Sequence, residues 1–247
     1  MRRLIAIIAV VIVTCTLLSA DVYIKQNHHT AAVTMMGQTQ PAKDQIQEIW
    51  VGKNKMATHA GEASMLLDLD KKVMYMVNHS NKSYIEMSVP VDISKYMPEQ
   101  MRGMIDSMMG SLKVTATPAN ETKTIKEWKS DAYNVKMEMS MMGMPMVMNM
   151  KVWASTAVPF DWEGVMKMMM DNMMKAQMRL SDEAVTEMKK VKGYWIEMEM
   201  SMNMMGADVK SKTSVLEIAK KTAGPNVYAV PEGYTKKDKM SMADMKK

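Results

Sequence analysis

Hydrophobic and polar residues alternate most regularly between Tyr133 and Trp153, and methionine occupies most of the hydrophobic positions. Successive side chains of an extended strand point to opposite faces, so every second residue shares a face. Gly143 and Pro145 lie near the middle of the stretch and suit a turn. The pattern predicts a half-buried β-hairpin with methionine on one face. The methionines are Met137, Met139, Met141, Met144, Met146, Met148 and Met150, and the polar residues between them include Lys136, Glu138, Ser140, Asn149 and Lys151.

The same alternation returns later in the chain, at Met198, Met200, Met202 and Met204. Elsewhere, short apolar segments are separated by polar turns at intervals of roughly 8 to 12 residues, which is typical of an antiparallel meander. A short apolar segment, Val227–Val230, comes near the end. The predicted strands are Val22–Met36, Gln45–Val51, Lys55–His59, Ser64–Asp68, Val73–Val77, Ser83–Ser88, Lys113–Ala119, Thr122–Trp128, Tyr194–Met204 and Val209–Lys220.

Two stretches have a different period. Apolar residues recur at three and four positions over Tyr96–Leu112 and again from Trp162 onward, which is the spacing of an amphipathic helix. The second stretch includes Met166, Met170 and Met173 on its apolar side, and Ser181 suits the N-cap of a restarted helix. The sequence therefore predicts an α+β fold, in which an antiparallel sheet carries helical insertions at Tyr96–Leu112 and Trp162–Lys192.

The first twenty residues have the three parts of a secretory signal peptide. Met1–Arg3 is positively charged, Leu4–Leu18 is apolar, and Ser19–Ala20 supplies small residues for cleavage. The apolar run is short for a membrane-spanning helix, and no later segment competes with it. We expect export to the periplasm and no transmembrane segment in the mature chain.

Cys15 is the single cysteine and would leave with the signal peptide, so the mature chain is expected to contain no disulfide. Thr14 does not suit the position before an acylated cysteine, and lipoprotein anchoring at Cys15 is therefore not expected. The mature chain is predicted to form one domain over residues 21–235. Residues 236–247 are charged and are expected to be a disordered tail.

Composition and charge narrow the range of functions. The net charge of +5 falls by two when Arg2 and Arg3 are removed, and the remaining basic residues are spread along the chain. A nucleic-acid binder normally concentrates its basic residues, so that class is not expected. Neither a glycine-rich phosphate loop nor a Gly-x-Ser-x-Gly turn is present. We therefore expect neither enzymatic activity nor a cofactor.

The four histidines allow one further metal hypothesis, a zinc site. The adjacent His28 and His29 point to opposite faces of a strand, so they cannot simply share one ion. A zinc site would require His59 and His79 to converge with them or with distant carboxylates.

Several short motifs resemble a known group of proteins. They are Thr124-Ile125-Lys126-Glu127-Trp128, Ala132-Tyr133, Gly193-Tyr194-Trp195-Ile196, Leu216-Glu217-Ile218 and Val227-Tyr228-Ala229-Val230-Pro231-Glu232-Gly233-Tyr234. Together they are similar to a family of uncharacterised exported bacterial proteins, which look like relatives of the periplasmic outer-membrane lipoprotein carriers. The resemblance covers most of the mature chain. It implies a half-barrel: a strongly curved antiparallel sheet with the helical insertions on its concave face. It implies no known reaction.

The 37 methionines, against a single phenylalanine, allow three interpretations. Methionine can replace leucine as a flexible core residue. It can also line a concavity that binds an apolar or lipid-like ligand, such as a lipoprotein acyl chain, which an envelope protein would then accept as partner. Thirdly, thioethers bind Cu(I) or Ag(I), and exposed methionines scavenge oxidants.

Each functional interpretation names its own residues. The ligand-lining candidates are Met137, Met139, Met141, Met144, Met146, Met148, Met150, Met166, Met170, Met173, Met198, Met200 and Met202. The alternative Cu(I) ligands are Met137, Met139 and Met141, opposite Met144, Met146 and Met148, together with Met240, Met242 and Met245 of the tail.

Overall fold

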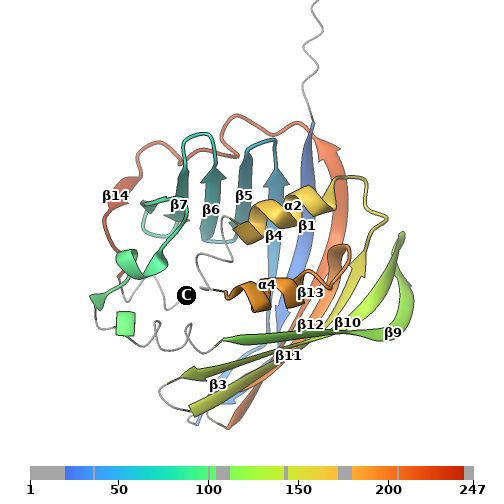
Figure 1. The fold of residues 1–247 in the computed structure, drawn as a ribbon. Helices are drawn as coiled ribbons and strands as arrows, with labels where there is room; N and C mark the ends of the chain where they lie inside the picture. Colours follow the sequence, from blue (N-terminus) through green and yellow to red (C-terminus); the bar gives the residue numbers. More distant parts are fainter. Residues whose placement is uncertain are drawn as a thin grey trace, which may run out of the picture.

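A computed structural model describes residues 20–35, 37–99, 101–103, 112–141, 144–171, 180–204 and 206–241. Nearly all of the predicted signal peptide lies outside these residues. Within them, twelve strands form one large sheet that is not closed into a barrel (Figure 1). The order of strands across the sheet is β14-β8-β7-β6-β5-β4-β1-β13-β12-β11-β10-β9. The mostly β structure, with few helices, agrees with the predicted α+β class.

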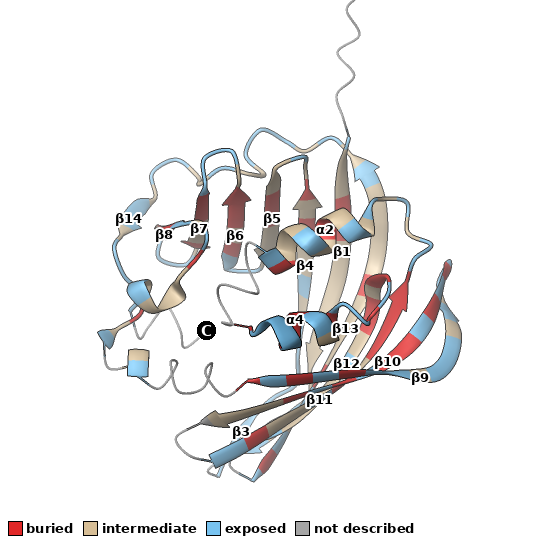
Figure 2. Cartoon of the chain, in the orientation of Figure 1, coloured by how far each residue is buried: buried red, intermediate tan, exposed pale blue. Residues whose placement is uncertain are grey.

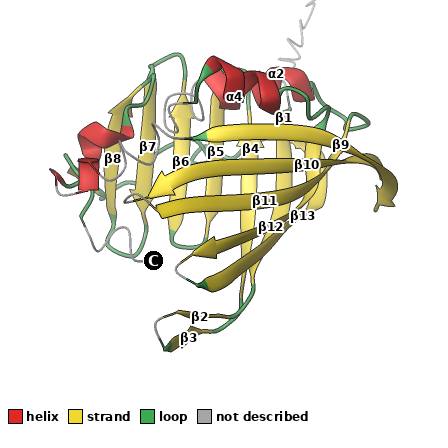
Figure 3. Cartoon of the chain, turned by 60° about the horizontal axis from the view of Figure 1, so that its bottom comes forward, coloured by secondary structure: helices red, strands yellow, loops and turns green. Residues whose placement is uncertain are grey.

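Most strands lie where the alternating segments predict them, but three predicted strands differ. The predicted strand Val22–Met36 is divided, because β1 ends at Thr30 and a separate strand occupies Val33–Met35. The predicted strands Lys113–Ala119 and Thr122–Trp128 join into one strand that ends at Ile125, because the chain turns at residues 126–127, where Lys126 has a φ of +54°. The first half contains β1 (Asp21–Thr30), β4 (Lys43–Val51), β5 (Lys55–Ala60), β6 (Ala63–Asp68), β7 (Val73–Asn78) and β8 (Ser83–Ser88). The second half contains β9 (Lys113–Ile125), β10 (Trp128–Met141), β11 (Met144–Ser155), β12 (Tyr194–Met204) and β13 (Ala207–Lys221). A separate hairpin of β2 (Val33–Met35) and β3 (Gln38–Gln40) extends away from the main sheet (Figure 3).

Strand β1 joins the two halves of the sheet. It pairs antiparallel with β4 on one side and with β13 on the other, so Ile24 lies opposite both Ile49 and Ile218. The Ile24 side chain is 0% exposed. The N-terminal strand is therefore central in the sheet although it comes first in the chain.

The described helices are short and lie on one face of the sheet (Figure 1). They are η1 (Ile93–Tyr96), α2 (Trp162–Met169) and α4 (Asp182–Met188). Asp161 caps α2 by accepting a hydrogen bond from the Gly164 N–H, and Ser181 caps α4 by accepting one from the Ala184 N–H. The predicted N-cap at Ser181 is confirmed.

The predicted helix bounds can be compared with the structure only in part. Residues 101–103 of the expected Tyr96–Leu112 helix are helical, and residues 104–111 lie outside the described residues. The second insertion, Trp162–Lys192, contains α2 and α4, and residues 172–179 between them are likewise not described.

Two apolar cores lie between the sheet and these helices. Val165 of α2 packs in a cluster with Met74, Met87 and Ile196 of the sheet. Val185 of α4 packs in a second cluster, formed with β9 to β12. Buried positions accordingly recur along the strands behind the helices (Figure 2).

The opposite face of β5 to β8 is also covered, by the chain that follows β13. Val227, Tyr228, Val230 and Tyr234 pack in a third apolar cluster, which includes the buried Leu66. The short apolar segment Val227–Val230 contains turns and forms no strand. Because both faces are covered, β6 and β7 are apolar on both sides.

The C-terminal segment differs from the expected disordered tail over residues 236–241. Strand β14 (Thr235–Lys237) pairs parallel with β8, and Lys236 forms an ion pair with Glu86 at 3.1 Å. The Met240 N–H donates to the Tyr96 carbonyl at 2.7 Å, and the Met240 side chain is buried. Residues 242–247 lie outside the described residues.

The β9 edge of the sheet is blocked by α4. Glu187 Oε2 accepts a hydrogen bond of 3.0 Å from the Ala116 N–H, which therefore points away from β10. Pro118, two residues further along the same strand, has no N–H to offer. The hydrogen bond from Lys190 and the Ala116 N–H lower the pKa of the Glu187 carboxyl, so it stays ionised as an acceptor. Both features disfavour pairing of this edge with another strand.

Gly193 allows a close approach between two segments at the start of β12. Its φ of +111° lies in a region that side-chain-bearing residues rarely adopt. A Cβ atom at this position would lie 2.5 Å from the Ser155 carbonyl carbon. Only glycine fits where the chain passes the end of β11.

Candidate functional site

The predicted methionine hairpin is present, and its register places methionines opposite one another. Across β10 and β11, Met139 pairs with Met146 and Met137 with Met148. The row continues onto β12, where Met148 pairs with Met202. Directly opposed residues of antiparallel strands point to the same face, so three strands share one methionine surface. This methionine face comprises Met137, Met139, Met146, Met148, Met150, Met198, Met200 and Met202.

Helices of the same chain cover much of the methionine face. The ligand-lining candidates that pack in the cluster with α4 are Met137, Met139, Met148, Met150, Met170, Met198 and Met200. Met146 is also buried, and Met202 is half-buried. Met144, at the hairpin tip, is 50% exposed. The side chain of Met141, and all of Met173, lie outside the described residues. The register of β10, β11 and β12 places their described methionines on one face, as the alternation predicts. The role of the methionines as ligand lining stays a prediction.

Two of the hollows formed by the described residues on the helix side of the sheet have mostly apolar walls. The first is a cleft of about 310 Å³ between α2 and α4. Met166 and Met170, two of the predicted lining residues, contribute to it from the α2 side, and Met188 and Val191 contribute from the α4 side. Lys167, Lys189 and Lys192 also line the cleft, together with Glu163 and Asp171, so it combines apolar groups with charges of both signs.

The second hollow, of about 420 Å³, lies over β5 to β8. Met65, Met76 and Ile85 form one cross-strand row on the helix side of the sheet, and Met240 closes it from the C-terminal segment. Its volume is in the range of cavities that hold small ligands. We name this hollow the β5–β8 cavity.

Sequence patterns did not single out the β5–β8 cavity. Methionines of the hairpin alternate with polar residues, but Met65 is followed by Leu66 and Leu67, and Met76 is followed by Val77. A strand that is covered on both faces shows no such alternation, so its cavity-facing residues cannot be separated from the others.

A chain of hydrogen bonds on the other face connects the sheet to the C-terminal segment. Ser64 Oγ lies 2.8 Å from His59 Nδ1 and 2.7 Å from His79 Nε2. His79 Nδ1 lies 2.9 Å from the Tyr234 hydroxyl, and His59 Nε2 lies 3.1 Å from the Val227 carbonyl oxygen.

Only one assignment satisfies all four contacts with neutral imidazoles. The Val227 carbonyl can only accept, so His59 donates from Nε2 and accepts at Nδ1 from the Ser64 hydroxyl. Ser64 then accepts from His79 Nε2–H, and His79 Nδ1 accepts from the Tyr234 hydroxyl. Protonation of His59 would place a second donor against Ser64 and break the sequence of bonds.

Stability should fall when His59 is protonated. Burial is the largest cause that lowers its pKa, and His79 lowers it further, although the Val227 carbonyl opposes the shift. The folded state therefore binds a proton less readily than the unfolded chain. The stabilisation is complete above about pH 6.5, the usual value, and is lost as the pH falls through the lower folded-state pKa.

This expectation is tested by urea unfolding at several pH values between 7 and 5. His59→Gln keeps one donor and one acceptor but cannot titrate in this range, so its free energy of unfolding should decrease less steeply toward pH 5 than that of the wild type. Equal slopes for the two proteins would contradict the assigned role of His59.

The histidines do not gather into a metal site. His28 Nδ1 contacts Thr213 Oγ1 at 3.0 Å, whereas His29 Nδ1 contacts Asp44 Oδ1 on the other face. Across the described part of the chain, no group of three or more His, Cys, Asp or Glu side chains could hold a metal ion.

Comparisons with known proteins supply no family. No protein-family model matches the chain, and no curated protein is similar to it in sequence. None of the described helices is long and apolar enough to cross a membrane.

Proposed function

We propose that the protein is a non-enzymatic binding protein for an apolar or amphiphilic ligand, such as a lipid or a lipoprotein acyl chain. The supporting observation is the β5–β8 cavity, which is lined by Met65, Met76, Ile85 and Met240 and lies on the same sheet face as the helices. Flexible thioether side chains adapt to apolar shapes of different length. The predicted signal peptide places this role in the periplasm.

In this proposal the sheet is a strongly curved half-barrel, and the helices lie on its concave face. Each buried CH₂ group of an acyl chain contributes about 0.8 kcal/mol, so the affinity depends on how much of the chain the cavity encloses. Release then requires either movement of the covering segments or an envelope partner that accepts the ligand.

Native mass spectrometry of protein purified without detergent tests the proposal. A bound mass of lipid size is expected, together with binding of a long-chain fatty acid added afterwards. Met76→Trp should fill the cavity and weaken fatty-acid binding at least tenfold. Met144→Trp, at the exposed hairpin tip, is the matched control and should bind as the wild type does. Absence of any bound lipid and of fatty-acid uptake would refute the proposal.

Cu(I) binding is a second candidate, favoured by one observation. Met137, Met148 and Met202 lie in one row on three neighbouring strands, so their side chains occupy adjacent positions on one face. Thioethers prefer soft ions such as Cu(I) and Ag(I). On this proposal the protein takes up Cu(I) under reducing conditions, and Met148→Leu, which removes the middle sulfur, lowers the affinity at least tenfold. Met65→Leu, outside the row, leaves it unchanged.

A further inference from the structure

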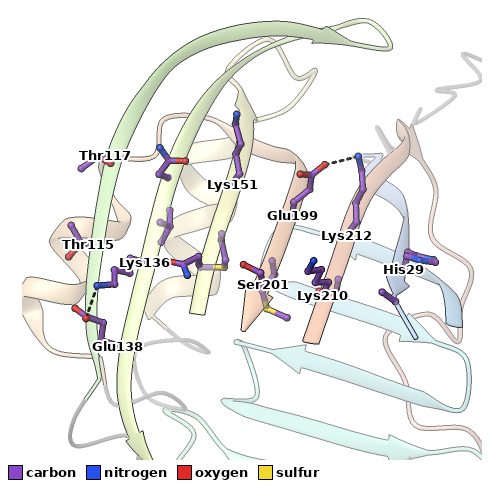
Figure 4. Close-up of a pocket in the computed structure, with 17 residues that line it drawn as sticks. His29, Thr115, Thr117, Lys136, Glu138, Lys151, Glu199, Ser201, Lys210 and Lys212 are labelled. Atoms are coloured by element: carbon purple, nitrogen blue, oxygen red, sulfur yellow. Dashed lines mark hydrogen bonds and ion pairs between the residues drawn. The ribbon is translucent and has the colours of Figure 1, made fainter. Parts of the chain in front are cut away.

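A groove of about 840 Å³, lined mainly by polar and charged residues, crosses the outer face of the second half of the sheet, opposite the methionine face (Figure 4). Its lining comes from β9 to β13, and His29 of β1 lies at one end. Alternation with methionine marks polar positions of β10 and β11, such as Lys136 and Asn149, but alternation alone does not show that the surface is hollowed.

Two parallel rows of side chains border the groove, and both follow from the strand register. The first row is Thr115, Lys136, Asn149, Ser201 and Lys210. The second row is Thr117, Asn134, Lys151, Glu199 and Lys212. The residues between the rows, such as Met150 and Met200, send their side chains to the other face, so they offer only main chain to the groove. Five neighbouring strands at about 4.8 Å spacing give the groove a length of roughly 19 Å.

The groove carries an excess of positive charge. Four lysines and two glutamates line it. Lys136 pairs with Glu138 at 2.8 Å, and Lys212 pairs with Glu199 and Glu197, each at 3.0 Å. Lys151 pairs at 2.7 Å with Glu121, which lies outside the groove lining. The exposed ammonium group of Lys210 forms no ion pair within the described part of the chain. An anionic ligand would therefore meet Lys210 without displacing an existing partner.

The chemistry of the lining argues against two classes of ligand, nucleic acids and extended peptides. No aromatic side chain is present among the described lining residues, so bases have no stacking platform. An extended peptide usually pairs with a free strand edge. Here the main chain of the floor is already hydrogen-bonded within the sheet, and the groove crosses the strands instead of following an edge. Side-chain amides, hydroxyls and ammonium groups are what the groove offers.

We propose that this groove binds an elongated anionic saccharide. Asn134, Asn149 and Ser201 bind sugar hydroxyls, and Lys136 and Lys210 bind carboxylate or phosphate groups along the chain. The sheet separates this ligand from the apolar ligand proposed above, so the two sites are independent.

Titration calorimetry with three short probes tests the assignment. The probes are hexagalacturonate, which is an anionic saccharide, maltohexaose, which is a neutral one, and hexaglutamate, which is an anionic peptide. Hexagalacturonate should bind at least tenfold more tightly than the other two. Equal binding of maltohexaose would show that charge is not recognised, and equal or tighter binding of hexaglutamate would assign the surface to acidic peptides; either result overturns the proposal.

Two double variants that each lose two positive charges distinguish binding in the groove from attraction to the overall positive charge of the protein. The double variant Lys136→Gln, Lys210→Gln should weaken hexagalacturonate binding at least tenfold. The control Lys53→Gln, Lys220→Gln lowers the net charge by the same amount, at exposed positions outside the groove lining. It should bind hexagalacturonate as the wild type does. Equal losses in both double variants would overturn the proposal. Unfolding curves of both confirm that each is folded.

Discussion

Gly193→Ala should lower the free energy of unfolding by about 3 kcal/mol or more. Alanine at φ +111° is strained, and its Cβ would lie 2.5 Å from the carbonyl carbon and 2.6 Å from the carbonyl oxygen of Ser155. Main-chain atoms at the junction of β11 and β12 cannot move aside as the end of a flexible side chain can. Urea unfolding followed by tryptophan fluorescence measures the loss.

Gly233→Ala is the matched control for this substitution. Gly233 also has a positive φ, +79°, but no atom lies within 4 Å of the position of its Cβ. It should cost only the backbone penalty of about 1 to 2 kcal/mol. Equal losses at the two glycines would show that the contact with Ser155 is not what requires glycine at 193.

Met87→Ala should destabilise the fold by about 2 to 5 kcal/mol, because it leaves a cavity in a packed core. The Met87 side chain is 0% exposed and lies in the cluster that joins β7 and β8 to α2. The free energy of unfolding from urea titration is again the measurement. The size of the loss shows whether a buried methionine of this core stabilises the fold as much as a buried leucine usually does.

Two further substitutions serve as controls for Met87→Ala. Met87→Leu conserves volume and should cost less than about 1.5 kcal/mol. Met144→Ala, at the exposed hairpin tip, should change stability by no more than about 0.5 kcal/mol. A leucine variant as unstable as the alanine variant would mean that the shape or sulfur of Met87 is required, and not only its apolar volume.

The sequence predicted strands well wherever one face is covered and the other is not. The alternation from Tyr133 to Trp153 predicted the hairpin, and the β10–β11 register bears out the pairing of Met137 with Met148. In the β4–β8 meander, where both faces of β6 and β7 are covered, it was the polar turns that delimited the strands, to within two residues at each end.

Tertiary packing determined the features that the pattern did not predict. Val227–Val230 has strand-like composition, yet it contains turns. Its apolar side chains cover one face of β5 to β8, and the main chains of these strands are already hydrogen-bonded to one another. The charge of residues 236–241 suggested disorder, but Lys236 forms an ion pair with Glu86, and β14 pairs with the edge strand β8. The candidate cavity depends on Met65, Met76 and Met240, which distant parts of the sequence bring together.

The central place of β1 also constrains the order in which the molecule can be assembled. Strands β4 to β8 and β9 to β12 pair with sequence neighbours, so each group can form from local contacts. Ile24 meets Ile218 only when nearly the whole chain has been synthesised, and this closure across distant residues carries the largest loop entropy of the fold. Until then the first strand has β4 as its only neighbour, and its other edge remains open.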